Sequence, residues 1–178
     1  MTPREVRVVP HDPAWTEAFE TEATALRFTL GDEALAVHHI GSTAVPGLSA
    51  KPTVDVLVEV RKIRKVDDFN GVLVGRDYEA WGEYGIPGRR FFTRNRGSVR
   101  TCNVHVFEAG TPEVERHLAF RDYLIQNPET ARAYGTLKKD LAERFPTDIQ
   151  AYMGGKDAFI KRTEREALFW SRIRDEAG

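Results

Sequence analysis

The run TVDVLVEV, residues 53–60, constrains the fold more than any other part of the sequence. Because side chains alternate between the two faces of a β-strand, all the valines of this run share one face. Asp55, Leu57 and Glu59 share the opposite face. The run therefore predicts a buried strand on which the Asp55 carboxylate points away from the valine core.

The residues before this strand predict a helix, a strand and a loop. Asp12 and Pro13 are typical of a helix start, since a carboxylate can cap the first turn and proline already has a helical φ. Apolar residues then recur at helical spacing as far as Gly31. Residues 35–40 are expected to form a short strand. Residues 41–52 are expected to form a loop, because their glycines and prolines oppose regular structure.

The residues after the strand predict more sheet and then helices only. A helix and a turn are expected over residues 61–80, and a hairpin with a longer loop around residues 95–98. In the second arm of this hairpin, Asn103 and His105 point away from the core face. Thr-Pro and Asn-Pro pairs, each supplying a cap and a first-turn proline, start two later helices, and a third begins near Asp148.

Length and composition narrow the class of protein. A chain of 178 residues fits one domain, here a sheet-containing core over residues 1–110 and a helical lobe over residues 111–178. With 26 basic and 27 acidic side chains, the overall charge favours neither a nucleic acid nor a membrane partner. Cys102 is the single cysteine, so no internal disulfide can form, and the N-terminal segment lacks the apolar core of a signal peptide. No apolar run is long enough to span a membrane, and we expect a cytoplasmic protein.

A Gly-Ser pair directly after a strand is typical of phosphate binding. Gly41 lets the backbone approach a phosphate, and the Ser42 hydroxyl and nearby amides can donate hydrogen bonds to it. Asp55 follows after twelve intervening residues, with its carboxylate on the non-core face, where it could hold Mg²⁺ against a triphosphate. The alternative is that the glycines only shape a tight connection and that Asp55 pairs with an arginine.

The segment HIGSTAVPGLSAKP-x-x-D, residues 39–55, resembles the GrpB family. The resemblance covers nearly the whole chain, from VP-x-DP-x-W at residues 9–15 through RRFF at 89–92 to FRDYL at 120–124, Leu137-Lys138 and Tyr152-x-x-x-Lys156. The family is placed in the nucleotidyltransferase superfamily. This resemblance implies an α+β fold, a small mixed β-sheet flanked by helices with a C-terminal helical lobe.

The resemblance also implies a nucleotide site. Gly41, Ser42, Thr43 and Lys51 would hold a triphosphate, and Asp55 would bind Mg²⁺ and act with Ser42 in catalysis. Well-understood nucleotidyltransferases carry two carboxylates two residues apart on one strand, where both face a pair of metal ions. Leu57 occupies the second position here. Glu59 faces the same side, but at the usual strand rise its α-carbon is roughly 13 Å from that of Asp55, too far for Glu59 to serve as the second carboxylate.

A further ligand is expected from the neighbouring strand. His105 is the best-placed residue to bind metal or phosphate, in an Asn103-Val104-His105 segment where the family commonly has His-x-His. An equally weighted alternative is a strand histidine that makes one structural hydrogen bond. Asn103 departs from the family.

Cations gather in two places along the chain. Residues 84–107 hold five arginines and no acidic residue, which suits a polyphosphate, although the same run could be a solvated hairpin or an RNA footprint. In the helical lobe, three cations lie on apolar stripes, where a lobe closing over an anion, snorkelling stems or buried ion pairs would explain them. The predicted nucleotide ligands among these cations are Arg89, Arg90, Arg121, Lys138 and Lys156.

Two functions follow from these residues. The first is transfer of a nucleotidyl group from a triphosphate to a small-molecule acceptor with Mg²⁺. The second is an inactive nucleotide-binding or protein-interaction module of the same fold, which agrees with Leu57 and with the family's occurrence as an appendage of dephospho-CoA kinase. An RNA-binding accessory factor is a weaker third, since the net charge is near neutral. The base, the acceptor and the oligomeric state do not follow from the sequence.

Overall fold

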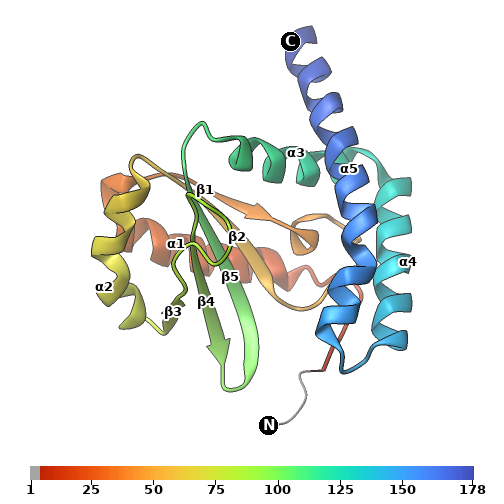
Figure 1. Cartoon of the computed structure of the whole chain (residues 1–178), viewed down its shortest axis with the longest axis horizontal. Helices are drawn as coiled ribbons and strands as arrows, with labels where there is room; N and C mark the ends of the chain where they lie inside the picture. The colour runs from red at the N-terminus through yellow and green to blue at the C-terminus, as the bar shows by residue number, and fades with distance from the viewer. Residues whose placement is uncertain (1–4) are drawn as a thin grey trace.

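The computed structural model describes residues 5–178 and has the predicted α+β class, with five strands and helices on both sides (Figure 1). The strand order is β1-β2-β5-β4-β3. The expectation about the N-terminal segment falls partly on residues 1–4, which lie outside the described part. Across residues 5–178, no helix combines the length and the apolar character that a bilayer crossing requires.

The sheet is mixed, and β2 (Val54–Val60) is one of its interior strands. It pairs antiparallel with β1 (Ala34–Ile40) and parallel with β5 (Val99–Glu108). β5 forms a hairpin with β4 (Arg90–Arg96), whose outer edge pairs with β3 (Tyr78–Ala80). The parallel pair β2 and β5 brings Asp55 directly beside Asn103.

The valine face of β2 carries the main core, as its alternation predicted. Helix α1 (Ala14–Leu30) covers this face and packs Trp15, Phe19 and Leu26 against the valines. All four valines of β2 are at most 3% exposed. Burying this face fixes the register of the strand, because a slip by one residue would put the valines on the opposite side.

Three local expectations were right in outline and wrong in detail. The loop of residues 41–52 begins with a 3₁₀ turn at Ser42–Ala44, since the positive φ of Gly41 folds the chain back and the Ala44 amide reaches the Gly41 carbonyl. The hairpin has a two-residue turn rather than a longer loop, because Arg96 already pairs with Val99. Residues 61–80 form a 3₁₀ segment (Ile63–Phe69), a short α2 (Asn70–Val74) and the edge strand β3, which was not expected.

The helical lobe consists of α3 (Pro112–Gln126), α4 (Pro128–Arg144) and α5 (Ile149–Ala177). Both predicted first-turn prolines are present, and Asp148 caps α5 by accepting a hydrogen bond from the Ala151 amide. The residues before the other two helices do not cap them with their side chains. The three helices stand on the β1 side of the sheet, and α5 extends beyond the rest of the molecule (Figure 1).

Leu57 has a structural role on the face that it shares with Asp55. Its side chain is fully buried and packs with Ile40, Phe107 and Val114 beneath α3. The position at which a second metal carboxylate was expected is therefore part of an apolar contact between sheet and lobe.

We predict that Leu57→Ala lowers the free energy of unfolding by about 2–5 kcal/mol, the usual effect of truncating a buried leucine. Leu57→Asp should lower it further, because the new carboxylate would be buried without a partner. Urea denaturation measures both effects. The matched controls are Leu35→Ala and Leu35→Asp, since Leu35 is 47% exposed. Equal effects of aspartate at both positions would contradict the structural role of Leu57.

Candidate functional site

The site begins at Gly41, immediately after β1. Gly41 has a φ of 73°, and a Cβ atom on it would lie 2.7 Å from Oδ2 of Asp55. Both features require glycine, because other residues rarely adopt this φ and the carboxylate occupies the space of a side chain. The predicted Gly-Ser turn and Asp55 are thus in direct contact.

Asp55 lies on the non-core face, as predicted, among hydrogen-bond donors. Its Oδ1 accepts a hydrogen bond of 3.1 Å from Nδ2 of Asn103, and Nε2 of His105 lies 3.6 Å from the same oxygen. Burial alone would raise the pKa of Asp55, but the interactions with His105 and Asn103 and the charge of Lys51 lower it below its ordinary value. The Asp55 side chain keeps 28% of its exposure, so a ligand can still reach it.

The proton of His105 can be placed from its neighbours. Nη1 of Arg89 lies 3.3 Å from Nδ1 of His105, and because arginine only donates, Nδ1 is the acceptor. The ring proton is then on Nε2, which faces Asp55. His105 therefore offers an N–H to the carboxylate rather than a lone pair to a metal ion.

Three lysines lie close enough for their charges to interact with one another and with Asp55, and we call Lys51, Lys138 and Lys156 the lysine cluster. Nζ of Lys138 lies 4.4 Å from the ring centroid of Tyr134, and Nζ of Lys156 lies 4.6 Å from that of Tyr152. Nζ of Lys51 is 5.5 Å from the Tyr152 ring, so one ring contacts two ammonium groups. The cluster joins the loop after β1 to both α4 and α5.

The two lobe lysines are buried, and no ion pair with a carboxylate is formed by either within residues 5–178. Lys138 is 2% exposed and Lys156 is 7% exposed, and within residues 5–178 no acceptor forms a hydrogen bond with Nζ of Lys138. Burial, together with the charges of the other two lysines, lowers the pKa of Lys138 to about 7. Burial and the charge of Lys51 lower the pKa of Lys156 to about 8. Such a cluster is unfavourable on its own and becomes favourable when an anion enters it.

Hydroxyl groups complete this environment. Burial raises the pKa of Tyr134, and the adjacent Ser42 side chain partly opposes that rise, which places the Gly-Ser turn against α4. The Tyr152 hydroxyl is buried and makes no hydrogen bond within the described chain. The site thus offers ammonium and hydroxyl donors beside a single carboxylate.

Three predicted ligands have other partners. Oγ1 of Thr43 is 2.9 Å from Nε2 of His39, whose pKa burial lowers to about 4, so the buried threonine supports the turn. Arg121 donates to the His39 carbonyl and pairs with Asp122. Arg90 lies on the opposite face of the sheet and makes two hydrogen bonds to Asp67. The structure brings Gly41, Ser42, Lys51, Asp55, His105, Lys138 and Lys156 together and buries Arg89 behind His105.

The described residues do not fit a two-metal centre. Leu57 is buried in apolar contacts, and Glu59 pairs with Nε2 of His38 at 2.6 Å. No group of three or more histidine, cysteine, aspartate or glutamate side chains within residues 5–178 is arranged to hold a metal ion. Among the described residues, Asp55 is the only acidic group whose charge acts on the two lobe lysines.

Four residues of the site were not predicted. Asn103 was noted only as a departure from the family, yet it orients Asp55. Tyr134 and Tyr152 each precede a cluster lysine by four residues, and this repeated Tyr-x-x-x-Lys spacing was a usable signal, since such residues meet on one helix face. His117 packs 5.4 Å from His105, and burial lowers the pKa of His117 to about 3. No sequence signal indicated it.

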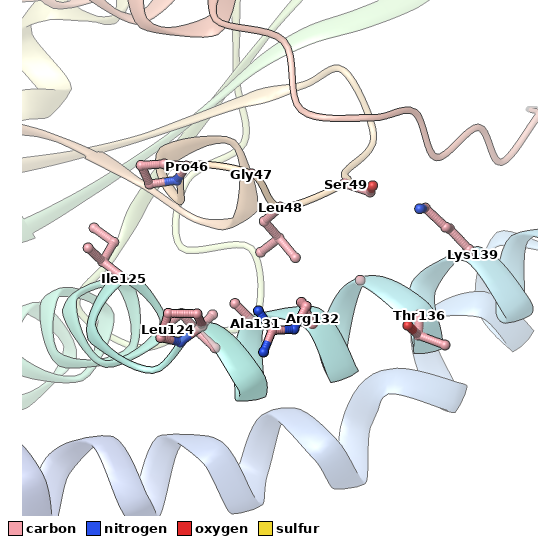
Figure 2. Close-up of a pocket in the computed structure, with 12 residues that line it drawn as sticks. Pro46, Gly47, Leu48, Ser49, Leu124, Ile125, Ala131, Arg132, Thr136 and Lys139 are labelled. Atoms are coloured by element: carbon pink, nitrogen blue, oxygen red, sulfur yellow. The ribbon is translucent and has the colours of Figure 1, made fainter.

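A separate groove lies on another face of α4. Figure 2 shows this groove between Pro46–Ser49 of the loop, the end of α3 and one face of α4. Its volume is about 510 Å³. Arg132, Thr136 and Lys139 line it from the helix. None of the predicted site residues lines this groove. Adjacent lysines of α4 thus face different sites, Lys138 the lysine cluster and Lys139 the groove.

The fold is that of nucleotidyltransferase-like proteins. The crystal structure of the Cid1 poly(U) polymerase matches with a TM-score of 0.52 at 15% identity, over 77% of this chain and 43% of the Cid1 chain. The chain itself belongs to the GrpB family, whose model, described as GrpB protein, matches residues 5–166.

Two members of the family are more similar. The crystal structure of conserved protein GrpB from Enterococcus faecalis has a TM-score of 0.88 and 48% identity, covering 92% of this chain and 99% of that one. UPF0157 protein YqkA of Bacillus subtilis is 43% identical over 174 residues, which are 98% of this chain and 50% of YqkA. The present chain therefore spans about half the length of YqkA.

We predict that Lys138→Met stabilises the ligand-free protein. Between its ordinary pKa of 10.5 and the folded value of about 7, Lys138 binds a proton in the unfolded state but not in the folded one. The free energy of unfolding therefore decreases as the pH falls from 10.5 to 7. At 1.36 kcal/mol per pKa unit, the decrease due to Lys138 is at most about 5 kcal/mol. Methionine keeps the apolar stem and removes this penalty.

Urea denaturation of both proteins across pH 7–10 measures the effect. The gain in Lys138→Met should be largest near pH 7 and shrink as the pH rises. Lys139→Met is the matched control, because Lys139 is exposed. A Lys138→Met protein less stable than the wild type at pH 7 would show that the ammonium is already satisfied.

Proposed function

We propose that this chain binds a nucleoside triphosphate through the lysine cluster, as a module of the nucleotidyltransferase fold that does not use two-metal chemistry. The observation that carries the proposal is the buried ammonium of Lys138, which has no acceptor within the described residues and lies beside two further lysines. A polyanion supplies the missing acceptors.

A polyphosphate suits the cluster better than a single carboxylate does. The ammonium groups come from three elements, the loop after β1, α4 and α5, so their ligand needs several charged oxygens spread along its length. Lysine binds phosphate as a point charge, and the Ser42 hydroxyl beside Tyr134 adds a neutral donor. The structural similarity to the Cid1 poly(U) polymerase supports a nucleotide as the carrier of these phosphates.

The site favours binding over nucleotidyl transfer to an acceptor. Transfer by paired metal ions requires a second carboxylate, and the buried Leu57 occupies its position. In this proposal the protein's own ammonium groups neutralise the phosphates, while Asn103 and His105 hold the Asp55 carboxylate in place. A single Mg²⁺ between Asp55 and the phosphates stays a prediction, as do a small-molecule acceptor and a cytoplasmic location.

Calorimetry with tripolyphosphate and with ATP or UTP, in EDTA, tests the proposal. We expect the wild type to bind all three, and Lys138→Met or Lys156→Met to weaken binding by at least tenfold, because each removes a buried charge-assisted contact. Lys139→Met should bind as the wild type does. Asp55→Asn should bind without Mg²⁺ at least as tightly, since it removes a negative charge near the phosphates.

Two results would contradict this proposal. Equal affinities of Lys138→Met and the wild type would exclude the lysine cluster as the phosphate site. Binding that requires Mg²⁺ and is lost in Asp55→Asn, with release of pyrophosphate, would favour the transferase instead.

Binding should also consume protons. Lys138 is largely neutral at pH 8, and a bound polyanion raises the pKa of both buried lysines, so protons are taken up with the ligand. The affinity for tripolyphosphate should therefore fall as the pH rises above about 7. Calorimetry at pH 8 in buffers of different ionisation enthalpy measures the number of protons, which should drop in Lys138→Met. A heat independent of the buffer would contradict the protonation argument.

A further inference from the structure

Two large aromatic side chains are exposed on the connection between β3 and β4. Trp81 is 43% exposed and Tyr84 is 62% exposed, and their ring centroids are 5.5 Å apart. We call this pair the aromatic platform. Nothing in the proposed phosphate site uses it.

The platform lies over the same face of the sheet as Asp55. Asp55, Asn103 and Thr93 form one row across β2, β5 and β4, and Nε1 of Trp81 donates to Oγ1 of Thr93 at 2.8 Å. Since neighbouring strands lie about 4.8 Å apart, the indole begins roughly 10 Å from Asp55 along this row. That distance suits a nucleoside whose phosphates reach the lysine cluster.

The platform is held rigidly. Tyr84 has a φ of 46°, a strained value for a bulky residue, and Nη2 of Arg89 donates to its carbonyl at 2.7 Å. The Tyr84 ring stacks on Phe91 with centroids 5.3 Å apart and planes at 17°. Ile86, from the same connection, packs against the apolar cluster around Leu57. A loop held in this way presents its rings in a fixed orientation, which limits the entropy lost on binding.

Arg89 connects the platform to Asp55. Besides the Tyr84 carbonyl, its guanidinium contacts Nδ1 of His105, whose Nε2 faces the carboxylate. Arg89 is 6% exposed, so its guanidinium is poorly accessible to a phosphate. Its hydrogen bonds instead hold the loop and His105 in position relative to each other. The platform and the phosphate site thus share one rigid support.

We infer that the aromatic platform stacks against the base of the nucleotide whose phosphates the lysine cluster holds. This inference rests on the proposed function and adds the base-binding part of the site. Stacking tolerates any base because every base has a π-face, so the platform recognises an aromatic base rather than a particular one. Loss of one stacking contact should weaken binding about tenfold.

Calorimetry on Tyr84→Asn, Tyr84→Phe and the wild type tests the inference in the full chain. Asparagine tolerates a positive φ, so the backbone should be kept while the ring is lost. Tyr84→Asn should bind ATP and UTP about tenfold more weakly and tripolyphosphate unchanged, and Tyr84→Phe should bind all three as the wild type does. Equal losses for tripolyphosphate and the nucleotides, or no loss for either, would overturn the platform as a base site.

Tryptophan fluorescence gives an independent readout. ATP should quench the emission and tripolyphosphate should not, and Trp81→Phe should abolish the ATP effect. Unchanged quenching in Trp81→Phe overturns the role of Trp81. A wild type that binds no tripolyphosphate, or a Lys138→Met protein that binds it normally, refutes the phosphate site itself, whereas failure at Tyr84 alone leaves that site intact.

Discussion

The contact between the Asp55 carboxylate and the backbone of Gly41 determines how the rest of the site is arranged. A side chain at position 41 would overlap the carboxylate, so the end of β1 and the non-core face of β2 can meet only through glycine. The positive φ of the same residue starts the 3₁₀ turn that brings Ser42 toward Tyr134 on α4. Asp55 is in turn fixed by Asn103 and His105, which belong to the neighbouring parallel strand.

The lysine cluster opposes the stability of the unliganded protein. Two lysine side chains with lowered pKa values and the Tyr152 hydroxyl are buried in the folded protein. Removing such groups from water without a partner makes the free energy of folding less favourable. Stacking against tyrosine rings offsets part of this penalty, because an ammonium group is attracted to an aromatic face. Buried groups with shifted pKa values are typical of functional sites. Proteins keep such residues for function although others at the same positions would make the fold more stable.

The sequence predicted the parts of this structure that depend on local pattern. The alternation in residues 53–60 gave the strand, its core face and the direction of Asp55, and the spacing around Lys138 and Lys156 marked both lysines as unusual. The pairing of side chains from distant segments could not be predicted in this way. Arg89 and Arg90 are adjacent in sequence, yet one supports His105 and the other pairs with Asp67 on the opposite face. That two adjacent strand residues point to opposite faces follows from the sequence. Which partner each arginine meets depends on how the 3₁₀ segment and the loop before β4 pack.

The origin of the three lysines in different elements has a mechanical consequence. Lys51 precedes β2, whereas Lys138 and Lys156 belong to helices of the lobe, so mutual repulsion acts across the joint between the two halves of the molecule. An anion bound among the three ammonium groups would remove this repulsion. It would attract groups from the sheet side and from the lobe at the same time. Because such a ligand contacts both parts of the molecule, its binding would stabilise the packing of the lobe on the sheet as well as the fold of each part.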